Sequence, residues 1–233
     1  MAPLIIYDFD GVIADSEVLA NAVLAQFVTE LGVPTTLEDS YRLYMGKRLN
    51  EVMAAVETSL GRPLPTGLPA EFQVRTLERF RKELRLVEGA RQHLDAFAHL
   101  RRCIASSSSP DRLAVCLDVL ELHNDFAGNV FSASAVARGK PHPDIFLHAA
   151  AQMQCEPADC IVIEDSASGV AAGIAAGMIV IGLMAASHMR PQHRSRLVSA
   201  GAHFIAATFE EATEITRRLI RSAGGLFPGG PVT

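Results

Sequence analysis

Strand-length apolar runs separated by helical patterns are the feature that most restricts the fold of this chain. After residue 102, amphipathic helical stretches lie between most of these runs, and Pro110 and Pro143 begin two of the helices. Such alternation is typical of βαβ units, so we predict an α/β fold with a doubly wound, Rossmann-like parallel sheet. The predicted strands are Leu4–Tyr7, Arg102–Ala105, Asn129–Phe131, Ile161–Ile163, Ile179–Ile181 and His203–Ile205.

The alternation is interrupted once, by about ninety residues between the first and second predicted strands. Apolar residues in this gap recur at helical spacing in three stripes, beginning at Leu19, Leu49 and Phe72. We therefore predict a helical-bundle cap at residues 15–86, inserted into a Rossmann-like core of residues 1–14 and 87–222. An insertion leaving the carboxyl end of a strand is placed to act as a lid over a ligand. Residues 223–233 are rich in Gly and Pro and are predicted to form a flexible tail.

Two carboxylates and a glycine follow the first predicted strand. Asp8 and Asp10 are two positions apart, so along a strand their side chains share a face, and Gly11 allows the backbone to turn sharply. Like charges held this close require a cation or a proton. The pair therefore predicts a bound cation, although acids that merely end a strand in a turn give the same local pattern.

Three further strand or loop ends carry polar residues suited to the same ligand. Ser106 and Ser107 begin a serine run that precedes a helix, and helix N-termini stabilise oxyanions. Lys140 lies between Gly139 and Pro141, and Glu164 and Asp165 follow another strand. Each feature alone also fits a helix cap, a solvated lysine or a turn. Together they predict a site for a divalent cation, Mg²⁺, and a phosphoryl group.

At this point the chain resembles the haloacid dehalogenase superfamily of phosphotransferases, in the branch with a helical cap after the first strand. The resemblance covers residues 4 to 215. It rests on four motifs in order: Asp8-Phe9-Asp10-Gly11-Val12, Ser106, Lys140 within residues 139–146, and Glu164-Asp165-Ser166 followed by Gly169 and Gly173.

The resemblance implies a role for each of these residues. Asp8 would be the nucleophile that forms an aspartyl-phosphate, and Asp10 the acid and then the base. The Asp8 side chain, the Asp10 carbonyl and Asp165 would hold Mg²⁺, with Glu164 binding it directly or through water. Phosphoryl oxygens would be bound by Lys140, Ser106, the Ser107 N–H and the loop at Gly11.

Three alternative functions remain open on the sequence. Asp10 argues against a dehalogenase or phosphonatase, although Lys47 leaves a phosphonatase-like Schiff base conceivable. A β-phosphoglucomutase-like mutase is the nearer alternative, but Ala20 occupies the position of that family's cap histidine, and Leu49 that of its cap arginine. A non-catalytic protein that binds phosphorylated ligands is the third. We expect a phosphatase of the haloacid dehalogenase type, a phosphoric monoester hydrolase.

Substrate selection is expected at two positions in the cap. The loop Gly46-Lys47-Arg48 and the helix start at Ser16 and Glu17 are the candidate specificity residues. Two cations there favour a sugar or sugar-acid phosphate, and an ordinary exposed basic turn is an equally good interpretation.

Composition narrows the expected partners and compartment. A net charge of −5 without a block of basic residues argues against nucleic acid. The four cysteines form no CxxC pair, which favours reduced thiols in a cytoplasmic protein without a secretory signal. Residues 169–186 carry no charge, but Gly177 divides them into two short elements, so no membrane span is expected. The expected partner is a small phosphorylated metabolite, and the expected state is a monomer or weak homodimer.

Overall fold

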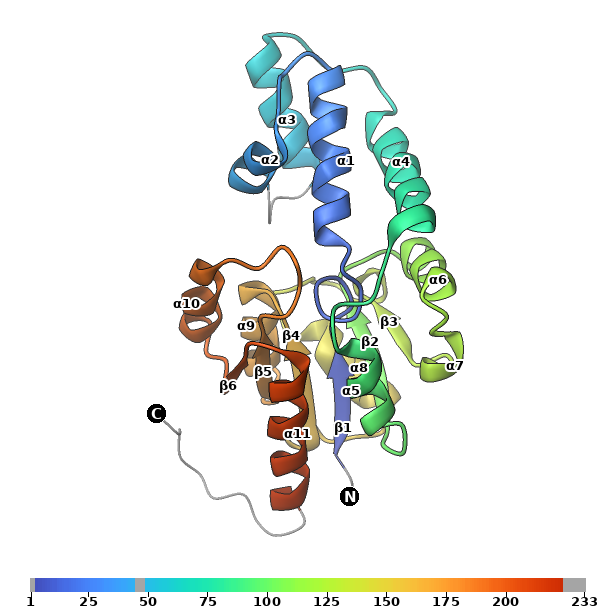
Figure 1. The fold of residues 1–233 in the computed structure, drawn as a ribbon, viewed down its shortest axis with the longest axis vertical. Coiled ribbons are helices and arrows are strands. Elements are labelled where there is room, and N and C mark those ends of the chain that lie inside the picture. The colour runs from blue at the N-terminus through green and yellow to red at the C-terminus, as the bar shows by residue number, and fades with distance from the viewer. Residues whose placement is uncertain (1–2, 45–48, 224–233) are drawn as a thin grey trace. The chain divides into compact units, whose positions relative to one another are not determined.

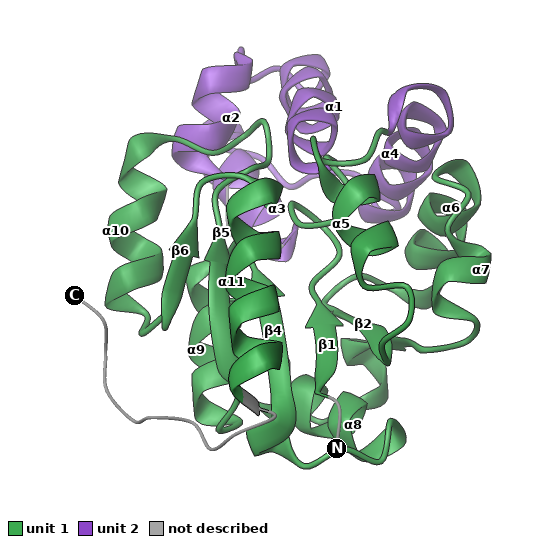
Figure 2. Ribbon diagram, turned by 60° about the horizontal axis from the view of Figure 1, so that its bottom comes forward, with its two compact units in different colours: residues 1–15, 85–233 green, residues 16–84 purple. Residues whose placement is uncertain are grey.

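The fold is described for residues 3–44 and 49–223 of a computed structural model of the chain. These residues form two compact units, one of residues 3–15 and 85–223 and the other of residues 16–84 (Figure 2). The predicted lysine-arginine loop at residues 46–48 and the predicted tail from residue 224 onward lie outside the described residues.

The first unit is built on a six-stranded parallel sheet with the order β3-β2-β1-β4-β5-β6 (Figure 1). The predicted α/β doubly wound class is confirmed. The first strand has its predicted bounds, and the other five begin and end within about two residues of theirs. The strands are β1 (Leu4–Tyr7), β2 (Arg102–Ser106), β3 (Val130–Ser132), β4 (Cys160–Glu164), β5 (Ile179–Leu183) and β6 (Phe204–Ala206).

Helices cover both faces of this sheet. Helices α8 and α9 pack on the face to which Leu4 and Ile6 point, and α5 and α11 lie on the opposite face. The helices of this unit are α5 (Ala90–Ala96), α6 (Pro110–Val119), α7 (His123–Phe126), α8 (Asp144–Gln152), α9 (Ala167–Ala175), α10 (Pro191–Ser199) and α11 (Phe209–Ala223), with 3₁₀ turns η1 (Ala133–Ala135) and η2 (Pro157–Asp159).

The strand order reverses beside β1. Chain order runs from β1 through β2 to β3 on one side, and then from β4 through β5 to β6 on the other. Ligands in open α/β sheets bind at the carboxyl ends of the strands beside such a reversal. The ends of β1 and β4 therefore mark where a site is expected, and the Asp8 N–H donates to the Ile163 carbonyl at 2.9 Å there.

The second unit is a helical bundle of α1 (Glu17–Glu30), α2 (Leu37–Leu43), α3 (Leu49–Leu60) and α4 (Leu68–Glu83). Its core is made by the apolar stripes of α1 and α3, including Leu24, Phe27 and Val56. The sequence stripes did not indicate α2, because seven residues are too few to show a clear helical period. Thr36 and Asp39 cap α2 reciprocally.

Two connections join the units, and their ends pair within the sheet unit. The Asp15 N–H donates to the Arg85 carbonyl at 2.9 Å, and the Val87 N–H donates to the Ile13 carbonyl at 2.9 Å. Ala14 and Leu86 form an antiparallel bridge. The chain therefore leaves and re-enters the sheet unit through one short paired segment.

The uncharged stretch at residues 169–186 contains most of α9 and all of β5, and Gly177, with φ +75°, lies between them. Among residues 3–44 and 49–223, none of the helices has the combined length and apolar character needed to cross a membrane. All four cysteines are free thiols, as expected.

Candidate active site

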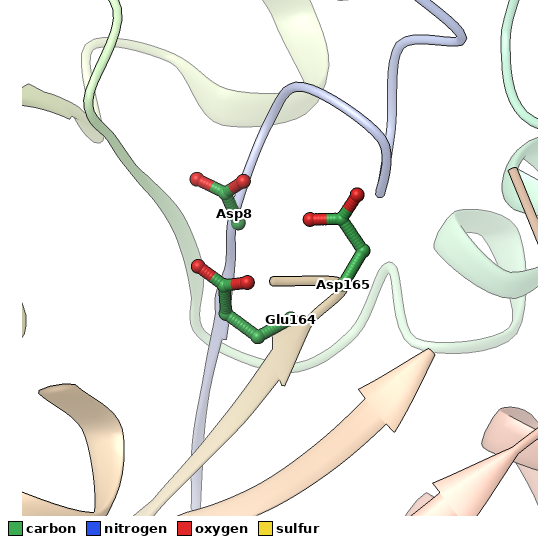
Figure 3. Close-up of side chains that lie close together, drawn as sticks. All are labelled: Asp8, Glu164 and Asp165. Carbon is green, nitrogen blue, oxygen red and sulfur yellow. The ribbon is translucent and has the colours of Figure 1, made fainter. Parts of the chain in front are cut away.

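Three carboxylates meet where β1 and β4 end (Figure 3). Asp8 follows β1, Glu164 is the last residue of β4 and Asp165 follows it. Each offers an oxygen within 4.8 Å of the other two, and all three residues are buried. One member of the first predicted acidic pair, Asp8, and both members of the second are thus brought together, because β1 and β4 are neighbours in the sheet.

Lys140 supplies the positive charge of this cluster. Its Nζ donates to Asp8 Oδ1 and to Glu164 Oε1 at 2.7 Å each, and to the Ala105 carbonyl at 3.2 Å. All three ammonium protons therefore have acceptors. Only 5% of the side chain is exposed, and the ammonium also lies 4.8 Å from the centre of the Phe146 ring.

Burial and charge act in opposite directions on the central pair. Burial raises the pKa of Asp8 to about 7, with Lys140 opposing the shift and Glu164 adding to it. For Lys140, burial lowers the pKa, but the Asp8 and Glu164 carboxylates outweigh it and the net shift is upward. The ammonium is therefore charged at neutral pH, and any further cation near Asp8 favours its ionised form.

Glu164 is held by donors from its own strand-to-helix turn. Its Oε2 accepts from the Ser166 N–H at 2.7 Å and from the Ser166 hydroxyl at 2.9 Å, and its Oε1 accepts from Lys140. Ser166 in turn accepts from the Gly169 N–H and caps α9. Both Glu164 oxygens are thus engaged by protein donors, so this carboxylate is less open to an additional ligand than Asp8.

Asp10 lies in the turn after β1 and directs its carboxylate to a different set of donors. Its Oδ2 accepts from the Ser108 hydroxyl at 2.5 Å, and its Oδ1 pairs with the Arg112 guanidinium at 2.5 Å. The Asp10 carboxylate is not a member of the three-residue cluster. Sequence reasoning missed Arg112; its position in the first turn of the helix opened by Pro110, just after the serine run, was the available signal.

The serine run begins with the last residue of β2, and its members make different contacts. Ser106 is buried and its hydroxyl accepts from the Ser108 N–H at 3.0 Å, whereas Ser107 is exposed in the turn. Ser109 caps α6 through the Arg112 N–H. One serine of the run therefore caps a helix, as the alternative interpretation predicted. The others place hydroxyl and N–H groups at the ends of the central strands.

Gly11 makes the close approach to Asp165 possible. Its φ is +78°, and a Cβ at this position would lie 1.8 Å from Asp165 Oδ2. Only glycine satisfies both conditions without displacement. This contact differs from the phosphate-binding role predicted for Gly11, which stays a prediction.

A histidine that the sequence did not suggest completes the surroundings of Asp165. His188 follows β5, and its Nε2 lies 3.4 Å from Asp165 Oδ2. Burial lowers the pKa of His188 to about 4, so the imidazole is neutral at pH 7. Its place in the loop after a predicted strand was the available signal, because the carboxyl end of β5 lies at the same edge of the sheet as the acidic residues.

None of the candidate specificity residues that the structure describes lies in the sheet unit, which holds the acidic cluster. Ser16 precedes α1 and Glu17 begins it, both in the helical unit. Gly46, Lys47 and Arg48 are among the residues not described. A role in substrate selection stays a prediction for all five.

The buried Asp8, the Lys140 paired with it and the Glu164–Asp165 strand end belong to the motifs on which the expected resemblance to the haloacid dehalogenase superfamily rests. The model of the haloacid dehalogenase-like hydrolases matches residues 2–177. The chain belongs to this family. The expected family is thereby confirmed, and so is the phosphatase class, since several relatives of the chain are named as phosphatases.

Three comparisons place the chain within the haloacid dehalogenase-like hydrolases. It is 28% identical to 6-phosphogluconate phosphatase of Escherichia coli over 188 residues, which cover 80% of this chain and 85% of that one. It is 40% identical to β-phosphoglucomutase of Bacillus subtilis over 80 residues, 34% of this chain and 35% of that one. A hydrolase of the family from Deinococcus radiodurans, solved with bound phosphate and sodium, superposes with a TM-score of 0.78 at 30% identity, covering 98% of this chain and all of that one.

Proposed function

We propose that this haloacid dehalogenase-like hydrolase is a Mg²⁺-dependent phosphomonoesterase that transfers the phosphoryl group of a small metabolite to Asp8 and then to water. The supporting observation is the buried cluster in which Asp8 contacts Lys140 beside Glu164 and Asp165. A carboxylate that can be ionised, a fixed ammonium and a second acidic group are the components that phosphoryl transfer to an aspartate requires.

Asp8 is the proposed nucleophile. Its Oδ1 is held by Lys140, which leaves Oδ2 as the oxygen that attacks phosphorus. A new Asp8–phosphorus bond forms as the ester oxygen departs with the bonding electron pair, and hydrolysis of the acyl phosphate then returns the free carboxylate. Lys140 carries a positive charge beside the reacting oxygens in both steps, where it stabilises the charge on the phosphoryl group.

The donor set fits a magnesium ion. Mg²⁺ prefers hard oxygen ligands and is commonly bound by one or two carboxylates together with substrate phosphate. Asp8 and Asp165 are the proposed carboxylate ligands, with the Asp10 carbonyl, and Glu164 is proposed to act through water because protein donors engage both its oxygens. When bound, the ion supplies neutralisation of negative charge on the phosphoryl oxygens.

Asp10 is the proposed acid and base. It donates a proton to the departing ester oxygen and afterwards accepts one from the attacking water. Ser108 and Arg112 hold its two oxygens in one orientation. Ser106, the Ser107 N–H and the loop at Gly11 are proposed to bind phosphoryl oxygens, because polar groups at this edge of the sheet converge on the same region.

The proposed substrate class is a sugar phosphate or a sugar-acid phosphate. The relative from Escherichia coli is named for a phosphorylated sugar acid and is similar over most of both chains. The cations Lys47 and Arg48 fit a hydroxylated or acidic leaving group. Ser16 and Glu17 are proposed to contribute to the same selection.

The test is phosphate release from a panel of sugar phosphates, sugar-acid phosphates, phosphoglycolate, nucleotides and an aryl phosphate, with and without Mg²⁺. We expect Mg²⁺-dependent release that Asp8→Asn abolishes and Asp10→Ala slows. Trapping of ³²P on the wild-type protein and not on Asp8→Asn would identify the acyl phosphate. Conversion of a sugar 1-phosphate into its 6-phosphate without net release would assign a mutase instead, and turnover retained in Asp8→Asn would exclude Asp8 as the nucleophile.

A further inference from the structure

The loop between β5 and α10, residues 184–190, contacts two functional parts of the sheet unit with two adjacent residues. Ser187 donates to Asp15 Oδ1 twice, from its backbone N–H at 3.1 Å and from its hydroxyl at 2.9 Å. Asp15 is the last residue of the sheet unit before the helical unit, and its N–H donates to the Arg85 carbonyl. Ser187 is thereby fixed to the paired segment where the chain leaves and re-enters the sheet unit.

The next residue, His188, reaches the acidic cluster. Its Nε2 lies 3.4 Å from Asp165 Oδ2, and 6% of each side chain is exposed. Its Nδ1 is buried and has no hydrogen-bond partner among the described residues. A carboxylate oxygen can only accept, so the ring tautomer that suits this arrangement carries its proton on Nε2, facing Asp165.

The turn after β1 and the His188 ring both lie close to the Asp165 carboxylate. The position that a Gly11 Cβ would occupy is 1.8 Å from Asp165 Oδ2 and 3.0 Å from the His188 Cε1 atom. The carboxylate is thus enclosed between the turn after β1 and the His188 ring. Figure 3 shows that one Asp165 oxygen points toward Asp8 and Glu164 while the other points away from them.

We propose that His188 is a positioning residue for Asp165 and that the Ser187–Asp15 contacts hold His188 in place. The inference rests on the proposed function, in which Asp165 is a Mg²⁺ ligand. Partners that orient a metal-binding side chain without touching the metal contribute about 10–100-fold to metal affinity. A loop outside the four motifs that identify the family would then determine how tightly this chain binds its cation.

The experiment is isothermal titration calorimetry of the full chain with Mg²⁺ alone, in the absence of any substrate. His188→Phe keeps a ring of similar size and removes the N–H, and we expect its Mg²⁺ dissociation constant to rise about 10–100-fold. His188→Gln places an amide N–H near the original Nε2 position, and we expect it to recover most of the affinity. The matched control is His148→Phe, because that ring packs edge-on against Phe131 of β3.

The role of Ser187 is tested in the same titration. Ser187→Ala removes the hydroxyl contact but keeps the backbone N–H contact, so we expect a smaller rise, about 2–5-fold, as is typical of losing one of two hydrogen bonds. Because this tether is proposed to act through His188, Ser187→Ala should add nothing in the His188→Phe background. Additive losses would show that Ser187 acts elsewhere and would overturn the tether.

The outcomes separate the inference from the proposed function. Wild-type protein that binds no Mg²⁺ overturns the proposed function and the inference with it. Wild-type and His188→Phe proteins that bind Mg²⁺ equally overturn the inference alone. An equal loss in His188→Phe and His188→Gln, with unchanged thermal midpoints, would also overturn it, because the N–H would then have no part in the effect.

Discussion

Replacing Gly11 by alanine tests whether the close approach of the first turn to Asp165 is needed for the proposed Mg²⁺ site. The added Cβ would lie 1.8 Å from Asp165 Oδ2, whereas ordinary contacts begin at 3.4 Å. The carboxylate must therefore move by about 1.6 Å, while metal–ligand distances tolerate only about 0.2 Å. The displacement exceeds this tolerance several-fold. We therefore expect Gly11→Ala to weaken Mg²⁺ binding by more than about 100-fold, the largest effect typical of residues that only orient a metal ligand.

The same substitution also strains the backbone, and that effect can be measured separately. A residue with a Cβ at φ +78° costs about 1–2 kcal/mol, which lowers the thermal midpoint of a chain of this size by about 2–8 °C. Gly177 provides the matched control, since its φ is +75° and no atom lies within 4 Å of its added Cβ. We expect Gly177→Ala to lower the midpoint similarly and to bind Mg²⁺ normally.

The assays are Mg²⁺ titration by calorimetry and thermal unfolding with and without Mg²⁺. The expected signature is a Mg²⁺-induced rise in midpoint that is present in the wild-type and Gly177→Ala proteins and lost in Gly11→Ala. Gly11→Ala protein that binds Mg²⁺ with wild-type affinity would refute the reasoning, because Asp165 would then not be a ligand that the turn confines.

Three further predictions follow from the charges and burial in the sheet unit. Lys140→Met leaves two buried carboxylates without their ammonium, so urea unfolding at pH 8 should show a loss of about 3–5 kcal/mol, against little change for the exposed Lys82→Met. Burial lowers the pKa of His93 to about 3, below its unfolded value of 6.5, so this group costs stability as the pH falls below about 6.5. Between pH 7.5 and 5 the wild type should lose about 2 kcal/mol more than His93→Phe in urea unfolding, and parallel losses would contradict the assignment. Arg112→Met removes one of the two groups that hold Asp10, the proposed acid, so kcat/KM should fall about 10-fold for an alkyl phosphate and much less for 4-nitrophenyl phosphate, whose leaving group needs no proton. Equal losses on both substrates would show that Arg112 does not orient the acid.

The strands of the sheet unit and the helices that begin at Pro110 and Pro143 could be predicted because short local sequence patterns mark them. Buried parallel strands are short continuous apolar runs, and the helices between them show a 3.6-residue period or begin at proline. Helix α2 was not predicted, because a helix of seven residues is held by contacts distant in sequence, such as the Ser40 hydroxyl donating to Asn21 Oδ1 at 3.0 Å.

The candidate site was predictable only in part, and for a physical reason. Asp8, Asp10, Lys140 and the Glu164–Asp165 pair each follow an apolar run or lie in a stiff loop, so their types and positions mark them in the sequence. Arg112 and His188 are marked only weakly, by a place in the first turn of a helix and a place in the loop after a strand. Their pairing with Asp10 and Asp165 arises from contacts across 102 and 23 residues. Neighbours of that kind depend on which strands pair and on how the loops between them pack.

The sequence by itself determined which candidate site residues follow the strands and at which edge of the sheet they lie, because strand ends are encoded by local apolar runs. Only the tertiary structure decided how those groups are paired. It placed Lys140 between Asp8 and Glu164, turned Asp10 toward Arg112, and set His188 against Asp165. These pairings depend on the strand order β3-β2-β1-β4-β5-β6, which brings β1 and β4 together although about 150 residues separate them.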